Sequence, residues 1–357
     1  MKKAYLVLED GHIFEGYAFG AEVESVGELV FNTGVVGYIE NISDPTYYGQ
    51  ILLQTFPLVG NYGVQPEDLE GKSYLRGYVV REWCETPSNF RSQYDIDKLL
   101  RDEGVPGIYG VDTREITAIL REQGAMNAAI CYEKPKDLEF IKNYAITDAV
   151  ASVTADESFV IEAKDETLFD VTLINYGRYK TIADTLSDLG CRVKVVPHTA
   201  TADEIMADAP AGIVLSNGPG DPAECIEEVE TIKALLGKYP MLGIGLGHQL
   251  MALANGGITF KLRHGHRGSN QPVRNMQGTH THITAQNHSY AVAPNSITNG
   301  NITFVNANDG TCEGIEYPEI RALSVQFHPE ACTGPINTFF VFDKFMKMMG
   351  GCEDAAE

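Results

Sequence analysis

The sequence lacks the run of about 20 apolar residues that a membrane-spanning helix needs. Its N-terminal apolar stretch, residues 4–8, ends at Glu9 and Asp10 and is shorter than the core of a signal peptide, roughly 7–15 residues. Basic residues are also scarce, with 27 Lys and Arg against 49 Asp and Glu and a net charge of −22. Nucleic acids and anionic membranes attract basic surfaces. We therefore expect a cytoplasmic protein that binds neither nucleic acid nor membrane.

Cysteines are few and scattered. The chain has seven, and no two of them form a Cys-x-x-Cys pair, so neither a zinc knuckle nor a dithiol redox site is indicated. Reduced thiols in the cytoplasm explain them most simply. His280 and His282 share a strand face, but no third ligand stands near them in the sequence, and we expect no metal site in this chain.

The two halves of the chain are patterned differently. Residues 1–148 hold short strand-like runs separated by glycine-containing turns, and one helix, which Asp112 or Thr113 caps and Gly124 ends. Residues 149–168 are acidic and weakly patterned, as in an interdomain linker. Residues 169–357 alternate strands with helices, which is typical of a doubly wound parallel sheet. We predict an α/β protein in which a β-rich α+β domain precedes a doubly wound domain.

The stretch GIGLGHQL, residues 243–250, joins a predicted strand to a predicted helix through three glycines. A dinucleotide-binding loop is one interpretation, but the glycine spacing is one residue short and no acidic residue follows at the ribose-binding position. A nucleophile elbow is the other interpretation, in which the residue at the tip of the turn attacks the substrate. Gly245 stands at that tip and has no side chain to attack with.

Two further strand ends favour the elbow. The last apolar strand ends in His328-Pro329-Glu330, which sets a carboxylate beside a histidine able to act as a base. Another strand ends in the loop SNGPGDP, residues 216–222, whose glycines leave N–H groups available for an oxyanion. Ligands of such sheets bind at the carboxyl ends of the strands, so we expect these segments to form one site.

These motifs resemble those of the class I glutamine amidotransferases, whose elbow reads G-x-C-x-G-x-Q and whose last strand ends in H-P-E. Further stretches resemble the small-subunit family of carbamoyl-phosphate synthetases over nearly the whole chain, among them GELVFNTGVVGY, DPTYYGQ, GVDTREITAILREQGAM, GHRGSNQPV, ITAQNHSYAV and SVQFHPEACTGP. The resemblance implies a glutamine-hydrolysing subunit in a heterodimer with a large synthetase subunit. The N-terminal domain would contact that subunit, which would use the released ammonia to make carbamoyl phosphate. ATP and metal ions would bind there, and no cofactor would bind to this chain.

The resemblance also implies roles for individual residues. His328 would be the general base and then the acid, and Glu330 would hold its tautomer, while the N–H groups of Gly220 and Leu246 would form the oxyanion hole. The other positions that match glutamine contacts are Thr46, Gly218, Gln249, Asn287, Ser289 and Tyr290. The family often has Ser at the position of Thr46, and Gly-Phe at the positions of Ser289 and Tyr290.

Gly245 is the main departure, because it stands where the family has its cysteine nucleophile. Without a thiol the thioester route is closed, and we expect glutamine hydrolysis to be abolished or severely impaired. Cys332 is the nearest thiol to His328 in the sequence, but it follows the strand end in a loop and is not expected to substitute. Glycine readily adopts the strained backbone of an elbow. We therefore expect a folded domain with an empty tip that still binds glutamine.

Two interpretations of Gly245 stay open. In the first, the chain is the small subunit of a glutamine-hydrolysing synthetase that has lost its nucleophile by design or by accident. In the second, it is a naturally inactive subunit of an ammonia-dependent synthetase that binds glutamine or serves as a scaffold. Neither interpretation tells whether the carbamoyl phosphate would serve arginine or pyrimidine biosynthesis.

Overall fold

The computed structural model describes residues 2–330, 334 and 336–350. The chain forms two compact units, one comprising Met1–Ala149 and Arg263–Gly268, the other Val150–Leu262 and Ser269–Glu357. No helix in the described part of the chain has both the length and the apolar character that crossing a membrane requires. Cys332 lies outside the described residues.

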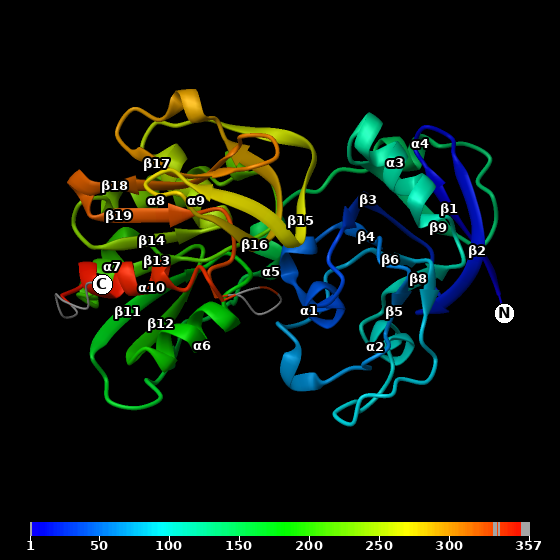
Figure 1. The fold of residues 1–357 in the computed structure, drawn as a ribbon, viewed down its shortest axis with the longest axis horizontal. Coiled ribbons are helices and arrows are strands. Elements are labelled where there is room, and N and C mark those ends of the chain that lie inside the picture. Colours follow the sequence, from blue (N-terminus) through cyan, green and yellow to red (C-terminus); the bar gives the residue numbers. More distant parts are fainter. Residues whose placement is uncertain (1, 331–333, 335, 351–357) are drawn as a thin grey trace. The chain divides into compact units, whose positions relative to one another are not determined.

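A closed barrel of strands forms the centre of the first unit (Figure 1). Its strands follow one another around the barrel in the order β1 (Lys3–Leu8), β2 (Ile13–Gly20), β8 (Pro106–Tyr109), β6 (Gly77–Val80), β4 (Gln50–Gln54), β3 (Ser25–Asn32) and β9 (Met126–Cys131). Two short strands, β5 (Leu58–Val59) and β7 (Glu82–Trp83), pair in parallel. The helices of this unit are α1 (Tyr38–Ser43), α2 (Ile96–Asp102), α3 (Thr113–Gln123) and α4 (Glu139–Lys142). The β-rich α+β character predicted for this half is thus observed.

Helix α3 has the boundaries that its capping residues predicted. The Asp112 side chain accepts hydrogen bonds from the N–H groups of Arg114 and Glu115, and Gly124 ends the helix at a φ of 104°. Asp112 thereby satisfies two of the N–H groups that have no partner within a helix. Its apolar face, with Ile116 and Leu120, is fully buried in the barrel unit.

The second unit contains a 10-stranded sheet. The strand order is β10 (Phe159–Ile161), β12 (Cys191–Pro197), β11 (Phe169–Asn175), β13 (Gly212–Leu215), β14 (Met241–Ile244), β19 (Ala322–Val325), β18 (Cys312–Tyr317), β16 (Thr281–Val292), β15 (Thr259–Asn275) and β17 (Asn301–Asn306). The five strands from β12 to β19 in this order run parallel. This block is the parallel sheet that the alternation of strands and helices predicted.

Helices pack against both faces of this parallel block. On one face, α7 (Ala202–Ala207), α8 (Ile226–Leu235) and α9 (Leu246–Ala254) bury apolar side chains with those of β13 and β14. On the other, α6 (Lys180–Asp188) and α10 (Phe340–Met348) pack with alternate residues of the same strands. Strands buried on both faces are apolar throughout, which is why GIVL of β13 and MLGI of β14 carry no polar residue.

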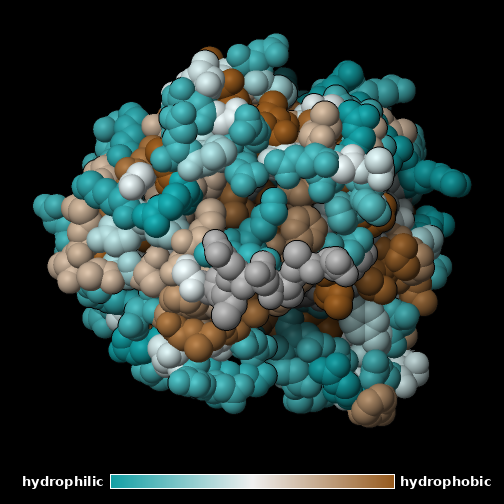
Figure 2. Space-filling view, turned by 60° about the vertical axis from the view of Figure 1, so that its left-hand side comes forward, coloured by the Kyte–Doolittle hydropathy of each residue, from teal (hydrophilic) through white to brown (hydrophobic). Residues whose placement is uncertain are grey.

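Residues 149–168, which the sequence suggested as a linker, contain two elements. They are helix α5 (Ala149–Val153) and strand β10, which pairs antiparallel with β12 at the edge of the sheet. All three residues of β10 are apolar, but Phe159 and Val160 are exposed, so this short edge strand buries little. Polar residues dominate the face shown in Figure 2, with smaller apolar areas between them, as the excess of acidic residues leads one to expect.

Candidate active site

The predicted site lies at the carboxyl ends of three neighbouring parallel strands, β13, β14 and β19. Leu215 of β13 pairs with Gly243 of β14, and Ile244 of β14 pairs with Val325 of β19. The residues that follow these strands are therefore brought to one edge of the sheet. They include Asn217, Gly245 and His328, which the sequence separates by up to 111 positions.

Gly245 has the backbone of a nucleophile elbow. Its φ is 58° and its ψ −111°, a conformation that residues with side chains rarely adopt. Its N–H donates to the carbonyl of Val325 at 2.9 Å, which ties the tip to β19. Helix α9 begins at the next residue. The strand-to-helix turn predicted from the sequence is present.

The two glycines on either side of the tip are required by close packing. A Cβ atom on Gly247 would lie 2.4 Å from the carbonyl oxygen of Leu215, and one on Gly243 would lie 2.7 Å from that of Gly247. Both contacts are with backbone atoms, which cannot move aside as a flexible side chain could. The glycine spacing of GIGLG thus allows α9 to start directly against β13, and no phosphate loop is needed to explain it.

His328 and Glu330 form a buried pair after β19. The Nδ1 atom of His328 lies 2.9 Å from Oε1 of Glu330, and the Glu330 side chain has no solvent-exposed surface. The Arg178 guanidinium lies 3.7 Å from the same carboxylate oxygen. Burial alone would raise the pKa of Glu330, but the His328 ring and the Arg178 charge together outweigh it and lower the pKa. The carboxylate is therefore ionised and accepts the Nδ1 proton of His328, which leaves Nε2 for a different partner.

Asn217 fills the space next to the tip. A Cβ atom on Gly245 would lie 2.1 Å from Oδ1 of Asn217, and the next two nearest atoms also belong to Asn217. The tip has no side chain of its own, and the space beside it is taken by Asn217. The physical reason is that a missing side chain leaves both room and N–H groups in need of an acceptor, and a neighbouring amide supplies one.

The N–H groups that converge in this region differ from the pair expected. Leu246 and Gly218 each donate from the backbone to Oδ1 of Asn217 at 2.8 Å. Leu246 was one of the two expected donors. Gly220, the other expected donor, has the positive φ of 92° of a tight turn. The hydrogen bonds of the described residues do not include one from its N–H to this oxygen.

The other predicted glutamine contacts fall on α9 and on β16. Gln249 follows the tip by one helical turn and donates from Nε2 to the carbonyl of Tyr290 at 2.7 Å and to Oε1 of Gln326 at 2.8 Å. Asn287 and Ser289 lie on β16 together with Tyr290. Thr46 lies in the first unit, where its hydroxyl donates to Oδ1 of Asp44 at 2.6 Å.

Sequence reasoning missed Asn217, Arg178 and His248. Asn217 stands inside the quoted loop SNGPGDP, but nothing in the sequence says where its side chain points. His248 is fully buried one position before Gln249, and its Nδ1 lies 2.8 Å from Oγ of Ser324 on β19. Burial lowers the pKa of His248 to about 3, so the ring is neutral. The sequence feature that could have pointed to His248 is a histidine in the otherwise apolar start of the predicted helix.

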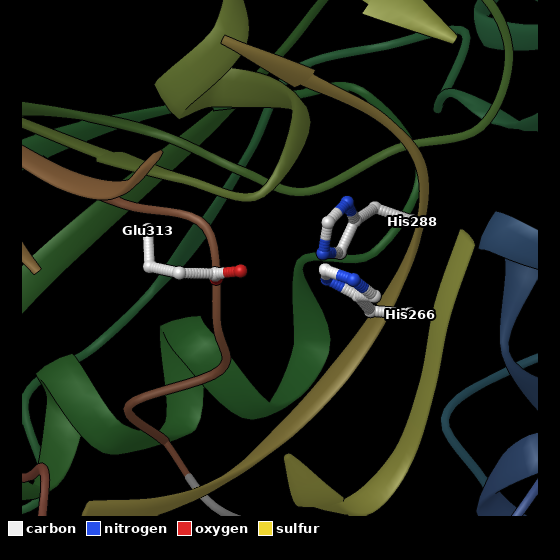
Figure 3. A group of neighbouring side chains, drawn as sticks. All are labelled: His266, His288 and Glu313. Carbon is white, nitrogen blue, oxygen red and sulfur yellow. The ribbon is translucent and has the colours of Figure 1, made fainter. Parts of the chain in front are cut away.

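A second buried polar cluster joins β16 and β18. Figure 3 shows His288 and Glu313, and Gln286 links them, with its Nε2 donating to Glu313 at 3.0 Å and its Oε1 lying 3.0 Å from Nε2 of His288. The other ring nitrogen of His288 lies 2.7 Å from the carbonyl of Tyr290. His266, also drawn there, belongs to the first unit. Because both nitrogens of His288 have protein partners, we interpret the cluster as a structural hydrogen-bond network.

Comparison with known families accounts for most of the chain. Residues 6–130 match the model of the carbamoyl-phosphate synthase small chain, CPSase domain, and residues 172–348 match that of the class I glutamine amidotransferases. A carbamoyl phosphate synthase small chain from Listeria monocytogenes is 45% identical over 361 residues, covering 99% of each chain. The chain belongs to this small-chain family.

Other members of the carbamoyl phosphate synthase small-chain family are similarly close. A relative from Clostridium perfringens is 46% identical and covers 97% of this chain and 99% of its own. The resemblance expected from the sequence motifs is thus confirmed. Among solved structures, a glutamine amidotransferase from Thermotoga maritima aligns with 50% of this chain and 82% of its own, at 17% identity and a TM-score of 0.39.

Proposed function

We propose that this chain is the glutamine-binding small subunit of a carbamoyl phosphate synthase and that, with Gly245 at its elbow, it does not hydrolyse glutamine by itself. The observation that carries the proposal is the buried His328–Glu330 pair beside the elbow backbone, in a member of the small-chain family. The partner is a large synthetase subunit that consumes ammonia. ATP and metal ions bind to that partner.

The proposed roles follow from the positions of the polar atoms. Nε2 of His328 lies 3.3 Å from Nδ2 of Asn217, the side chain next to the tip, so Nε2 would take the proton of a nucleophile there and return it to the leaving ammonia. Glu330 would stabilise the protonated ring. The N–H groups that meet beside the tip, with Leu246 among them, would stabilise the oxyanion. Gln249, Asn287, Ser289 and Tyr290 would hold the rest of the glutamine.

Gly245 removes one component of this machinery and leaves the others in place. No thioester can form at a residue without a thiol, and water would have to attack the amide directly. Loss of the nucleophile alone cost on the order of 10⁶ in kcat in a serine protease whose triad was dismantled. We therefore expect a loss of similar size here.

The deciding experiment is a glutaminase assay of this chain and of Gly245→Cys, each with the large subunit present. We expect activity in the Gly245→Cys variant and none above background in the parent chain. Gly245→Ala is the matched control, because it adds a Cβ atom without a thiol and should stay inactive. Strong glutaminase activity in the parent chain would contradict the proposal.

One observation favours the second candidate, a subunit that has become a glutamine-binding or scaffold component of an ammonia-dependent synthetase. The Asn217 amide already satisfies the N–H groups beside the tip, so the site is stable without a nucleophile. Synthesis of carbamoyl phosphate by the complex from ammonia, but not from glutamine, is expected for this candidate as well as for the first, and the two differ in whether Gly245→Cys restores synthesis from glutamine. Synthesis from glutamine at a rate comparable to that from ammonia would exclude it.

A further inference from the structure

The Asn217 side chain is held at both ends of its amide group. Its Oδ1 accepts two backbone hydrogen bonds, from Gly218 and Leu246, each at 2.8 Å. Its Nδ2 lies 3.3 Å from Nε2 of His328. Since Nδ1 of His328 is committed to Glu330, Nε2 is the acceptor and the Asn217 amide donates to it. Asn217 is 1% exposed, so water does not compete for these groups.

This arrangement matches what the site would offer to a substrate. In hydrolysis of a glutamine amide, the carbonyl oxygen would face the oxyanion donors and the nitrogen would face the histidine that protonates it. Asn217 presents the same group, a primary carboxamide, with its oxygen at the N–H groups and its nitrogen at His328. It also lies within 2.1 Å of the place where a nucleophile's Cβ would be.

We propose that Asn217 is an internal cap of this site, a carboxamide of the chain itself that occupies the oxyanion donors and the histidine in place of the amide of a bound ligand. Glycine at position 245 is what gives this cap its room. A side chain at 245 and the present position of Asn217 exclude each other. A ligand amide must likewise displace the Asn217 side chain before it reaches the same donors.

The first test is competition with L-glutamine, and it rests on the proposed function. Calorimetric titration should show glutamine binding roughly tenfold tighter to Asn217→Ala than to the parent chain, because the hydrogen bonds of the cap no longer have to be broken. Asn175→Ala is the matched control. Asn175 is also fully buried at a strand end and accepts a backbone hydrogen bond, from Gly177 at 2.8 Å, but its partners are not those of the tip. Its affinity should equal that of the parent chain.

The second test does not involve glutamine. In a double-mutant cycle on urea unfolding, Gly245→Ala should lower the midpoint more in the parent chain than in the Asn217→Ala background, since the added Cβ would lie 2.1 Å from Oδ1 only where Asn217 is present. Backbone strain at the tip is the same in both backgrounds and cancels. The corresponding cycle with Asn175→Ala should be additive. Asn217→Ser, whose shorter side chain cannot reach His328, gives a second variant for the same cycle.

The outcomes separate the cap from the proposed function. Coupling between positions 217 and 245 with no glutamine binding in any variant would support the cap and refute the proposed function. Equal glutamine affinity in the parent chain and in Asn217→Ala, together with an additive cycle, would overturn the cap while the proposed function stands. Tighter glutamine binding and a coupled cycle would support both.

Discussion

The segments that follow β14 and β19 are neighbours at one edge of the sheet, yet they differ in which parts of the predicted catalytic site they contain. After β19, His328 and Glu330 keep a buried hydrogen bond with the Arg178 charge behind it. After β14, the backbone keeps the elbow conformation, but a glycine stands at the tip and Asn217 fills the space. The comparison teaches that the shape of an elbow does not depend on its nucleophile. Packing of the flanking glycines and the bond to Val325 maintain it instead.

The largest effect on activity should come from substituting His328 or Glu330, the residues after β19, in a chain whose nucleophile has been restored after β14. In the Gly245→Cys background, His328→Asn should lower glutaminase activity by about 10⁴-fold, because the base is lost. Glu330→Gln should lower it as well, by on the order of 10²-fold, since the ring keeps its place but loses its charged partner. Both are measured as ammonia released with the large subunit present.

A partly buried histidine–glutamate pair of the same unit provides the control for these variants. His198 Nδ1 lies 2.6 Å from Oε1 of Glu228, but the pair does not bond to any residue of the elbow that the structure describes. His198→Asn should leave the activity of the Gly245→Cys variant unchanged. A similar loss of glutaminase activity from His198→Asn and His328→Asn would mean that His328 has no specific role in the reaction.

An intermediate effect, on stability, should follow from adding an atom to the closely packed turn after β14. Gly247→Ala places a Cβ atom 2.4 Å from the Leu215 carbonyl oxygen, and overpacking against backbone should lower the free energy of unfolding by about 3 kcal/mol. Urea unfolding measures this loss. Gly278→Ala is the control, because its Cβ would have no neighbour closer than 3.9 Å. Equal stability of the two variants would show that the glycine spacing does not shape the elbow.

The smallest effect concerns His248, which links the two strand ends through Ser324. Burial lowers its pKa to about 3 in the folded chain from 6.5, so protonation favours the unfolded chain below that ordinary value. The stability from this group is complete above pH 6.5. It falls by roughly 1.4 kcal/mol per pH unit as the pH decreases towards 3.

His248→Gln should remove this slope, because its side chain does not titrate. The free energy of unfolding measured between pH 7 and pH 5 would then fall less steeply in the variant than in the parent chain. Replacement of the exposed His280 by Gln is the control and should keep the slope of the parent. An unchanged slope in His248→Gln would contradict the burial argument.

Much of the fold could be predicted because it depends on local patterns. The caps of α3 at Asp112 and Gly124 determine its ends, and fully apolar segments such as GIVL determine the buried parallel strands. Strand β10 was not predicted, because a short edge strand buries little and carries a weak pattern. Assignment of Arg263–Gly268 to the first unit was also unpredictable, since it depends on contacts far along the chain.

The sequence by itself determined the family, the parallel sheet, the turn at Gly245 and the pairing of His328 with Glu330, because motif spacing and strand ends are local properties. Only the tertiary structure decided what occupies the tip. Asn217 and Gly245 are 28 positions apart in the chain, and whether their atoms meet depends on the register of β13 and β14 and on one side-chain rotamer. Glycine leaves a space that the sequence reveals, whereas the amide that fills it is selected by the geometry of the folded sheet.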